Sequence, residues 1–264
     1  MGNIPAQMAM TVLIPILATN ALTFALQESS IPGKIVLGVL FVGSIFSWAI
    51  MVTKIRTLNF ARRQTDHFLA HFRSDREPLR LYRDGASFEG APSFVVYVAG
   101  CDELAFQLLG STEIDETFPA RLEMAPKISP VQHRAVVTAM ERAVGEQGLK
   151  LESQTILLAT AVSGAPFLGL LGTVWGVMDT FTSVAIAGAP NLAAMAPGVS
   201  GALITTVVAL LVAIPAMFGY NFIVTSIRTQ LVQMENFAAE LSSEFEHKYV
   251  SHGPNLVERL ATFR

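Results

Sequence analysis

The chain has 264 residues, of which 52% are hydrophobic and only 15% carry a charge, and its mean hydropathy is +0.48. Soluble domains carry charge on about a quarter of their residues, so this composition excludes an ordinary soluble protein and predicts membrane segments. The net charge of −3 provides no basic field for nucleic acid, and the single cysteine, Cys101, excludes an internal disulfide.

The first segment, residues 1–34, contains an apolar stretch from Met8 to Leu26 that Pro15 and Asn20 interrupt. No basic residue precedes this stretch, which counts against a signal peptide. We expect an interfacial or partly inserted helix here, and a fourth span or a signal-like segment are the alternatives.

Three apolar runs predict transmembrane helices. They cover residues 35–53, 154–183 and 198–225. A helix of about 20 residues crosses a hydrocarbon core ~30 Å thick, so each run is long enough. Asp179 is the only charged residue within the three runs. A linker over residues 184–197, rich in alanine, glycine and proline, joins the second and third runs into a predicted hairpin.

The remaining segments are mixed in charge and show helical periodicity. Residues 54–153 predict a helical domain built on extensions of the first two spans, with Val131 to Ile156 leading directly into the second span. Residues 226–264 predict an amphipathic C-terminal helix, because apolar residues such as Ile227, Leu231 and Met234 recur at three- and four-residue steps.

The distribution of basic residues predicts the orientation. Of the 18 Lys and Arg residues, 13 lie between Lys54 and Lys150, four follow Thr225, and only Lys34 lies elsewhere. The positive-inside rule therefore puts residues 54–153 and 226–264 in the cytoplasm, and residues 1–34 and 184–197 in the periplasm. The predicted fold is an all-α integral membrane protein whose three transmembrane helices extend into a cytoplasmic helical bundle.

Residues that could carry chemistry are few. The five histidines lie outside the predicted spans, and His67 and His71, although four residues apart, have no evident third metal ligand. No nucleophile set or phosphate loop is present, so we predict neither an enzyme nor a cofactor or metal site.

The second and third runs each carry a face of small residues. In the third run these residues fall within an arc of about 100° at ~100° per residue. They are Gly198, Ala202, Thr205, Thr206, Ala209, Ala213 and Ala216. The second run has a similar face of Pro166, Gly169, Thr173, Gly176 and Thr180. Such faces are typical of close helix packing in lipid.

Two motifs resemble a known family. Residues 169–176, with the sequence GLLGTVWG, resemble the signature of the MotA/TolQ/ExbB proton-channel family in its TolQ/ExbB branch. Ala196-Pro-Gly198, Ala202-Leu-Ile204, Thr206 and Ala213-Ile-Pro-Ala216 resemble that family's last span. The resemblance covers most of residues 35–250. One departure is Gly201, which stands where family members often carry glutamate.

The resemblance implies a homopentamer around a single-span TolR/ExbD-like partner whose membrane aspartate carries the proton. Such motors of the inner membrane use the proton motive force for outer-membrane transport or envelope maintenance. The resemblance further implies that threonines matching Thr173 and Thr206 line the inner face of the pentamer. Sodium in place of the proton stays open.

From this we predict roles for particular residues. Thr173, Thr206 and Thr205 are predicted to line the proton pathway. Small residues at the packing or pore face are Gly169, Gly176, Ala202, Ala209 and Ala213. Pro215 is predicted to kink the last span, because it lacks a backbone donor. Thr173 and Thr206 should lie at similar depth, because their midpoint, about residue 190, is close to the centre of the predicted linker.

Asp179 lies about 120° from the Thr173 face on a helical projection. We expect it to face the outer interface or a neighbouring subunit, and a place in the proton path is the alternative. Two other functions are kept as alternatives for the whole chain. One is a flagellar-type stator, which requires Met8 to Leu26 to be a fourth span, and the other is a passive membrane scaffold.

Overall fold

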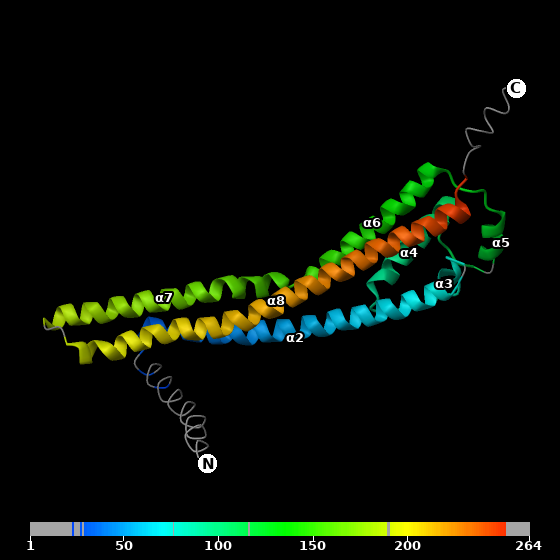
Figure 1. Cartoon of the computed structure of the whole chain (residues 1–264). Helices are drawn as coiled ribbons and strands as arrows, with labels where there is room; N and C mark the ends of the chain where they lie inside the picture. The colour runs from blue at the N-terminus through cyan, green and yellow to red at the C-terminus, as the bar shows by residue number, and fades with distance from the viewer. Residues whose placement is uncertain are drawn as a thin grey trace, which may run out of the picture. The chain divides into compact units, whose positions relative to one another are not determined.

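The computed structural model of the chain describes residues 23, 27, 29–75, 77–115, 117–188 and 191–251. In this part of the chain the regular structure is helical, apart from an isolated parallel bridge between Ile128 and Val250 (Figure 1). The helices are α2 (Ile31–Ser74), α3 (Arg80–Arg83), α4 (Pro92–Leu109), α5 (Phe118–Met124), α6 (Pro130–Glu152), α7 (Thr155–Ala187) and α8 (Leu192–Tyr249). The predicted N-terminal interfacial helix within residues 1–34 falls largely outside the described residues.

Three of the described helices, α2, α7 and α8, are long and apolar enough to cross a membrane. Each coincides with one of the predicted spans, so the expectation of an all-α fold with three helices able to cross a membrane is confirmed for the described residues by length and composition. The helices are longer than the predicted spans. The predicted C-terminal helix is the continuation of α8 as far as Tyr249, and residues 252–264 lie outside the described part.

The connection between α7 and α8 is shorter than the linker predicted over residues 184–197, whose place outside the membrane stays a prediction. Helix α7 continues to Ala187 and ends on Gly188, which has a left-handed φ of 67° and donates its N–H to the Val184 carbonyl. Helix α8 then begins at Leu192. Alanine, leucine and methionine are strong helix formers, which explains why these flanks are helical.

The stretch from Val131 to Ile156, which we expected to lead directly into the second span, is interrupted by a break of two residues between α6 and α7. Helix α6 ends at Glu152, Gln154 has a left-handed φ of 66°, and α7 begins at Thr155. Ser153 ends α6 by donating its hydroxyl to the Lys150 carbonyl at 2.8 Å. A non-glycine residue in this conformation gives no signal in the sequence.

The described contacts divide the chain into two compact units, which we call the apolar unit (residues 1–53 and 154–222) and the charged unit (residues 54–153 and 223–264). The sequence of the apolar unit holds only three of the chain's 39 Asp, Glu, Lys and Arg residues, which are Glu28, Lys34 and Asp179. The division therefore separates the apolar runs from nearly all of the charge.

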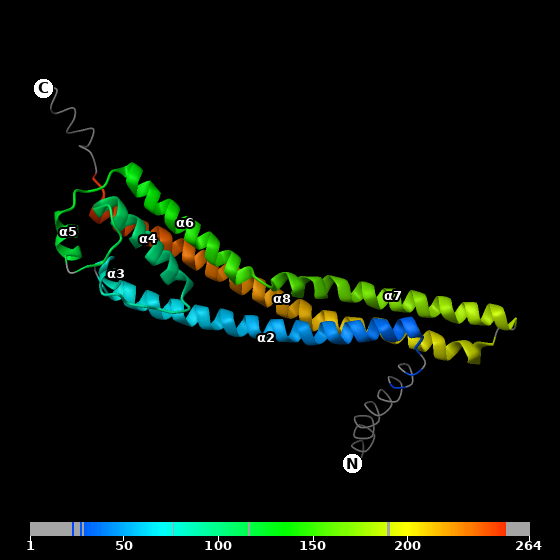
Figure 2. The same ribbon diagram turned by 180° about the vertical axis from the view of Figure 1, so that it is seen from behind.

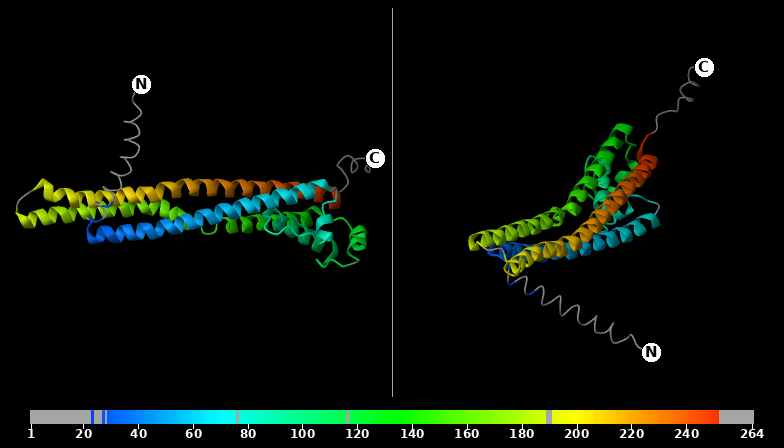
Figure 3. Two further views of the ribbon diagram at one scale, coloured as in Figure 1. Left: turned by 90° about the horizontal axis from the view of Figure 1, so that it is seen from below. Right: turned by 60° about the vertical axis from the view of Figure 1, so that its left-hand side comes forward.

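In the apolar unit, α2 and α8 run parallel and α7 runs antiparallel to both (Figures 1 and 3). Ser29 Oγ donates to the Gly201 carbonyl at 3.0 Å, and further along the same pair Gly219 lies against the Met51 side chain. The core is a buried cluster of Val36 and Leu40 from α2, Ala165 from α7, and Ala209 and Ala213 from α8.

The charged unit is a helical bundle in which α4, α6 and the later parts of α2 and α8 pack together (Figure 2). Its core is aromatic. Phe237 lies 5.3 Å from Phe68 and 5.2 Å from Phe72 between ring centroids, and both pairs meet edge to face, the arrangement that aromatic rings favour. Tyr97 joins them, and its hydroxyl donates to the Pro78 carbonyl at 2.8 Å.

Candidate functional site

Glycines of α7 bring α8 into close contact along the hairpin. A Cβ atom added to Gly172 would lie 2.5 Å from Thr205 Oγ1, and one added to Gly176 would lie 2.7 Å from Ala202 Cβ. A Cβ on Gly169 would overlap the Ala209 methyl group. Real Cβ atoms do not approach other atoms so closely, so these positions require glycine.

The same contacts define the register of the hairpin. Gly176 faces Ala202 and Gly172 faces Thr205, which centres the pair of helices on residue 189, next to the expected centre at about 190. Thr173 therefore lies at nearly the same level as Thr205 and Thr206. The agreement arises because, in an antiparallel hairpin of two helices, residues that are equally far in sequence from the turn lie at the same level.

Three hydroxyls gather at this level, and all donate to main-chain carbonyls. Thr205 and Thr206 donate to the Gly169 carbonyl at 3.1 and 3.0 Å. Thr205 Oγ1 also lies 2.7 Å from the Ala202 carbonyl, and Thr173 donates to the Leu170 carbonyl at 2.8 Å. A hydroxyl whose hydrogen is engaged in this way keeps its lone pairs as acceptors, and rotation about the C–O bond makes it a donor again.

Exposure separates the three threonines. Thr205 is 0% exposed, because the missing side chain of Gly172 lets α8 close over it. Within the single chain it therefore exposes no surface, and its predicted place on the proton pathway stays a prediction. Thr173 and Thr206 are both partly exposed within the single chain, so they retain surface at the level of the three hydroxyls.

The small residues predicted for the packing or pore face lie inside the chain. Gly169 and Gly176 are buried, and Ala202, Ala209 and Ala213 are 3%, 0% and 6% exposed. They hold α7 and α8 together. Gly172 was missed as a member of this set, although the glycine spacing of residues 169, 172 and 176 follows the helical steps of three and four that signal one face.

Pro215 lies inside α8, which stays helical on both sides of it. The predicted kink at this position stays a prediction.

Asp179 is exposed on α7, and no described residue forms an ion pair with it or a hydrogen bond to its carboxylate. It borders a small cavity of about 250 Å³ together with Ser30, Thr180 and Ser183. Gly201, at the position where the family often carries glutamate, is buried and accepts the Ser29 hydroxyl.

Among the described residues, no group of three His, Cys, Asp or Glu side chains could hold a metal ion. His67 and His71 contact each other with ring centroids 4.4 Å apart, and both pack on Phe88, at 5.7 and 5.5 Å. This aromatic cluster lies in the charged unit.

Comparison with known proteins decides the family. The model of the MotA/TolQ/ExbB proton channel family matches residues 111–236. The Tol-Pal system protein TolQ of Pseudomonas aeruginosa is 32% identical over 199 residues, which cover 74% of this chain and 80% of that protein. The chain belongs to the MotA/TolQ/ExbB proton channel family.

Further relatives place it in the TolQ/ExbB branch of that family. TolQ of Haemophilus influenzae is 29% identical over 86% of this chain and 95% of its own length. The biopolymer transport protein ExbB of Pseudomonas putida is 30% identical over 84% of this chain and 64% of its own length. The predicted membership is thus confirmed. A MotA/TolQ/ExbB protein with three apolar helices is a membrane channel subunit, and the family is not a known family of enzymes.

Proposed function

We propose that this chain is the proton-channel subunit of an inner-membrane motor. In this proposal it works with a TolR/ExbD-like single-span partner and uses the proton motive force for outer-membrane transport or envelope maintenance. The observation that carries the proposal is the pair of partly exposed hydroxyls, Thr173 and Thr206, at one level of a glycine-packed hairpin.

The apolar unit cannot relay a proton by itself at this level. Among its described residues Asp179 is the sole carboxylate, and it lies six residues from Thr173, or about 9 Å along α7. Intramembrane proton relays normally use an ionisable side chain. The carrier is therefore an aspartate of the partner, and the two hydroxyls accept from its protonated form and donate to its ionised form.

The proposed assembly is a homopentamer with α7 and α8 on the inside and α2 on the outside. Support comes from α2 in the apolar unit, where most of the exposed side chains are large and apolar. They include Phe41, Ile45, Phe46 and Trp48, each more than half exposed. Such a surface suits lipid. In the proposed orientation the N-terminus is periplasmic, and the charged unit and C-terminus are cytoplasmic.

The burial of Gly169, Gly176, Ala202 and Ala209 within one chain also favours a second candidate, a passive scaffold whose small residues only pack helices. The two candidates differ in what they need from another chain. A channel subunit of this kind requires a partner with a membrane carboxylate, and a scaffold does not.

Purification from the native membrane in mild detergent separates the candidates. We expect a second protein to co-purify that has one apolar span with an aspartate inside it. As a control, replacing that aspartate with asparagine should preserve the complex and abolish motor-dependent function. If this chain is made at normal levels in the cells and purifies without such a protein, the result would support the scaffold.

A further inference from the structure

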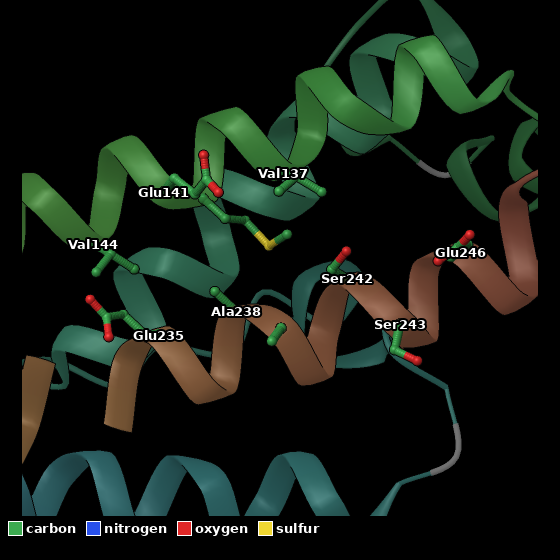
Figure 4. A pocket seen from close by; sticks show the side chains of 10 residues that line it. Val137, Glu141, Val144, Glu235, Ala238, Ser242, Ser243 and Glu246 are labelled. Atoms are coloured by element: carbon green, nitrogen blue, oxygen red, sulfur yellow. The ribbon is translucent and has the colours of Figure 1, made fainter. Parts of the chain in front are cut away.

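A groove of about 540 Å³ runs between α6 and α8 in the charged unit (Figure 4). Its lining includes Met140 and Val144 from α6 and Ala238 from α8, which are 1%, 6% and 8% exposed. The groove is thus an apolar trough on the surface of a bundle, and neither the ion route nor the hairpin uses it.

Three carboxylates border the trough: Glu141 on α6, and Glu235 and Glu246 on α8 (Figure 4). No described residue forms an ion pair or a side-chain hydrogen bond with any of them. Some other acidic residues of the same unit are paired, as Glu240 is with Arg73 at 2.7 Å. An apolar floor with unpaired acids at its edges fits an amphipathic helix that carries basic residues beside its apolar face.

The chain leaves the described structure at one end of this groove. Ile128, just before α6, donates its N–H to the Tyr249 carbonyl at 2.9 Å, and its own carbonyl accepts from the Ser251 N–H at 2.9 Å. Ser251 is therefore held between the start of α6 and the end of α8. These are the two helices that form the groove, and Glu246 lies little more than one turn before this point.

The sequence that follows has the pattern that the groove requires. Leu256, Val257, Leu260 and Phe263 fall within an arc of about 120° on a helical projection, at ~100° per residue. Arg259 and Arg264 fall toward opposite edges of this arc. Glu258, the one acidic residue among residues 252–264, projects to the far side, where it would face solvent.

The lengths also agree. Residues 252–255 include the turn-forming pair Gly253-Pro254, and four extended residues span about 13 Å, enough to reverse the chain direction. Leu256 to Phe263 as a helix would be about 11 Å long, and the stretch of α8 from Glu246 to Ala238 is about 12 Å long.

We propose that residues 252–264 dock in the α6–α8 groove of their own chain as an amphipathic helix, with Arg259 and Arg264 beside the three carboxylates. A second copy of the chain is the competing occupant. The chain's own segment is favoured because it is tethered at the end of the groove, which gives it a high effective concentration there.

The first test measures access to the groove. Ala239 is exposed and borders the groove, so Ala239→Cys reports on its occupancy, and Cys101 gives little background because it is fully buried. We expect a thiol reagent to label Ala239→Cys about tenfold more slowly in the full chain than in a chain ending at Ser251. That ratio corresponds to docking by about 1.4 kcal/mol. In a full chain that also carries Leu260→Asp and Phe263→Asp, the cysteine of Ala239→Cys should be labelled as fast as in the shortened chain.

A matched control is Thr138→Cys, on the exposed side of α6 and outside the groove, which should label equally in all three chains. Equal labelling of Ala239→Cys in the full and shortened chains would overturn the proposal.

The second test identifies the chain that supplies the segment. Ser243→Cys and Leu256→Cys are combined and oxidised, since Ser243 borders the end of the groove near Glu246. A disulfide within one chain, seen at the mass of a single chain, is the expected result. A disulfide that joins two chains would contradict docking in the same chain and would assign the groove to a second copy.

Discussion

The contact between Gly169 and α8 determines whether Gly169→Ala stabilises or destabilises the protein. In Gly169→Ala the new methyl carbon would overlap the Ala209 methyl, and would lie 3.0 Å from the Thr206 Cα and 3.2 Å from the Thr205 carbonyl oxygen. Favourable carbon contacts lie at about 3.5–4.0 Å. Two of these neighbours are backbone atoms, so α7 and α8 must move apart.

The size of the effect follows from three terms, of which two destabilise the protein and one stabilises it. Overpacking of this kind costs about 1–3 kcal/mol. Replacing glycine with alanine inside a helix recovers about 0.5–1 kcal/mol. Separation of the helices also lengthens the two hydroxyl bonds to the Gly169 carbonyl, and such bonds contribute about 0.6 kcal/mol each in membrane proteins. We expect a net destabilisation of about 1–3 kcal/mol.

Gly164→Ala, five residues earlier in α7, is the matched control, because nothing lies within 4 Å of a Cβ atom at Gly164. This variant should gain about 0.5–1 kcal/mol. The assay is equilibrium unfolding of the purified protein, with loss of helical circular dichroism as the signal. If Gly169→Ala proved as stable as Gly164→Ala, the close approach of α7 and α8 would be refuted.

Three further predictions concern other parts of the protein. Asp179→Asn should leave proton-coupled function intact, since Asp179 is exposed and unpaired among the described residues; loss of function at normal assembly would place it in the proton path. Native mass spectrometry in detergent should give five copies of the chain, and a dimer or tetramer would reject the proposed assembly. Burial raises the pKa of the Cys101 thiol, so its reactive thiolate form is suppressed and it should resist iodoacetamide near pH 8 unless the protein is unfolded; rapid alkylation of the native protein would show that Cys101 is accessible.

The fold was largely predictable because membrane helices impose long uncharged runs on a sequence. The three runs lie in α2, α7 and α8, the described helices that are long and apolar enough to cross a membrane, and the charge pattern closely matched the division into two units. The helix ends were less predictable. Residues 184–187 and 192–197 are helical although glycine and proline occur in that segment, and Gln154 interrupts the helix although it is an ordinary residue in the sequence.

The sequence predicted which residues gather on the hairpin, but it did not predict how deeply each of them is buried. Helical periodicity put Thr205 and Thr206 on one face, yet a difference of one residue buries Thr205 completely and leaves Thr206 partly exposed. That difference depends on which α7 residue faces α8. Gly172 faces Thr205, and a projection of α8 alone contains no information about this partner.

The central claim is that the hydroxyls of Thr173 and Thr206 take part in proton transfer. Valine is nearly isosteric with threonine, so Thr173→Val and Thr206→Val remove a hydroxyl and retain most of the packing. The lost bonds, to the Leu170 and Gly169 carbonyls, contribute about 0.6 kcal/mol on average and at most about 1.7, too little to unfold the assembly. Thr205→Val, which removes a buried hydroxyl, is the variant with which these two are compared.

The decisive measurement is proton flux through the purified complex with its partner, reconstituted in liposomes with an internal pH-sensitive dye and an imposed membrane potential. We predict that Thr173→Val and Thr206→Val each reduce the flux at least about tenfold, equivalent to about 1.4 kcal/mol on the barrier, at unchanged oligomer mass and partner content. Thr205→Val should have a smaller effect. Near-normal flux through both the Thr173→Val and Thr206→Val complexes would contradict the assigned pathway.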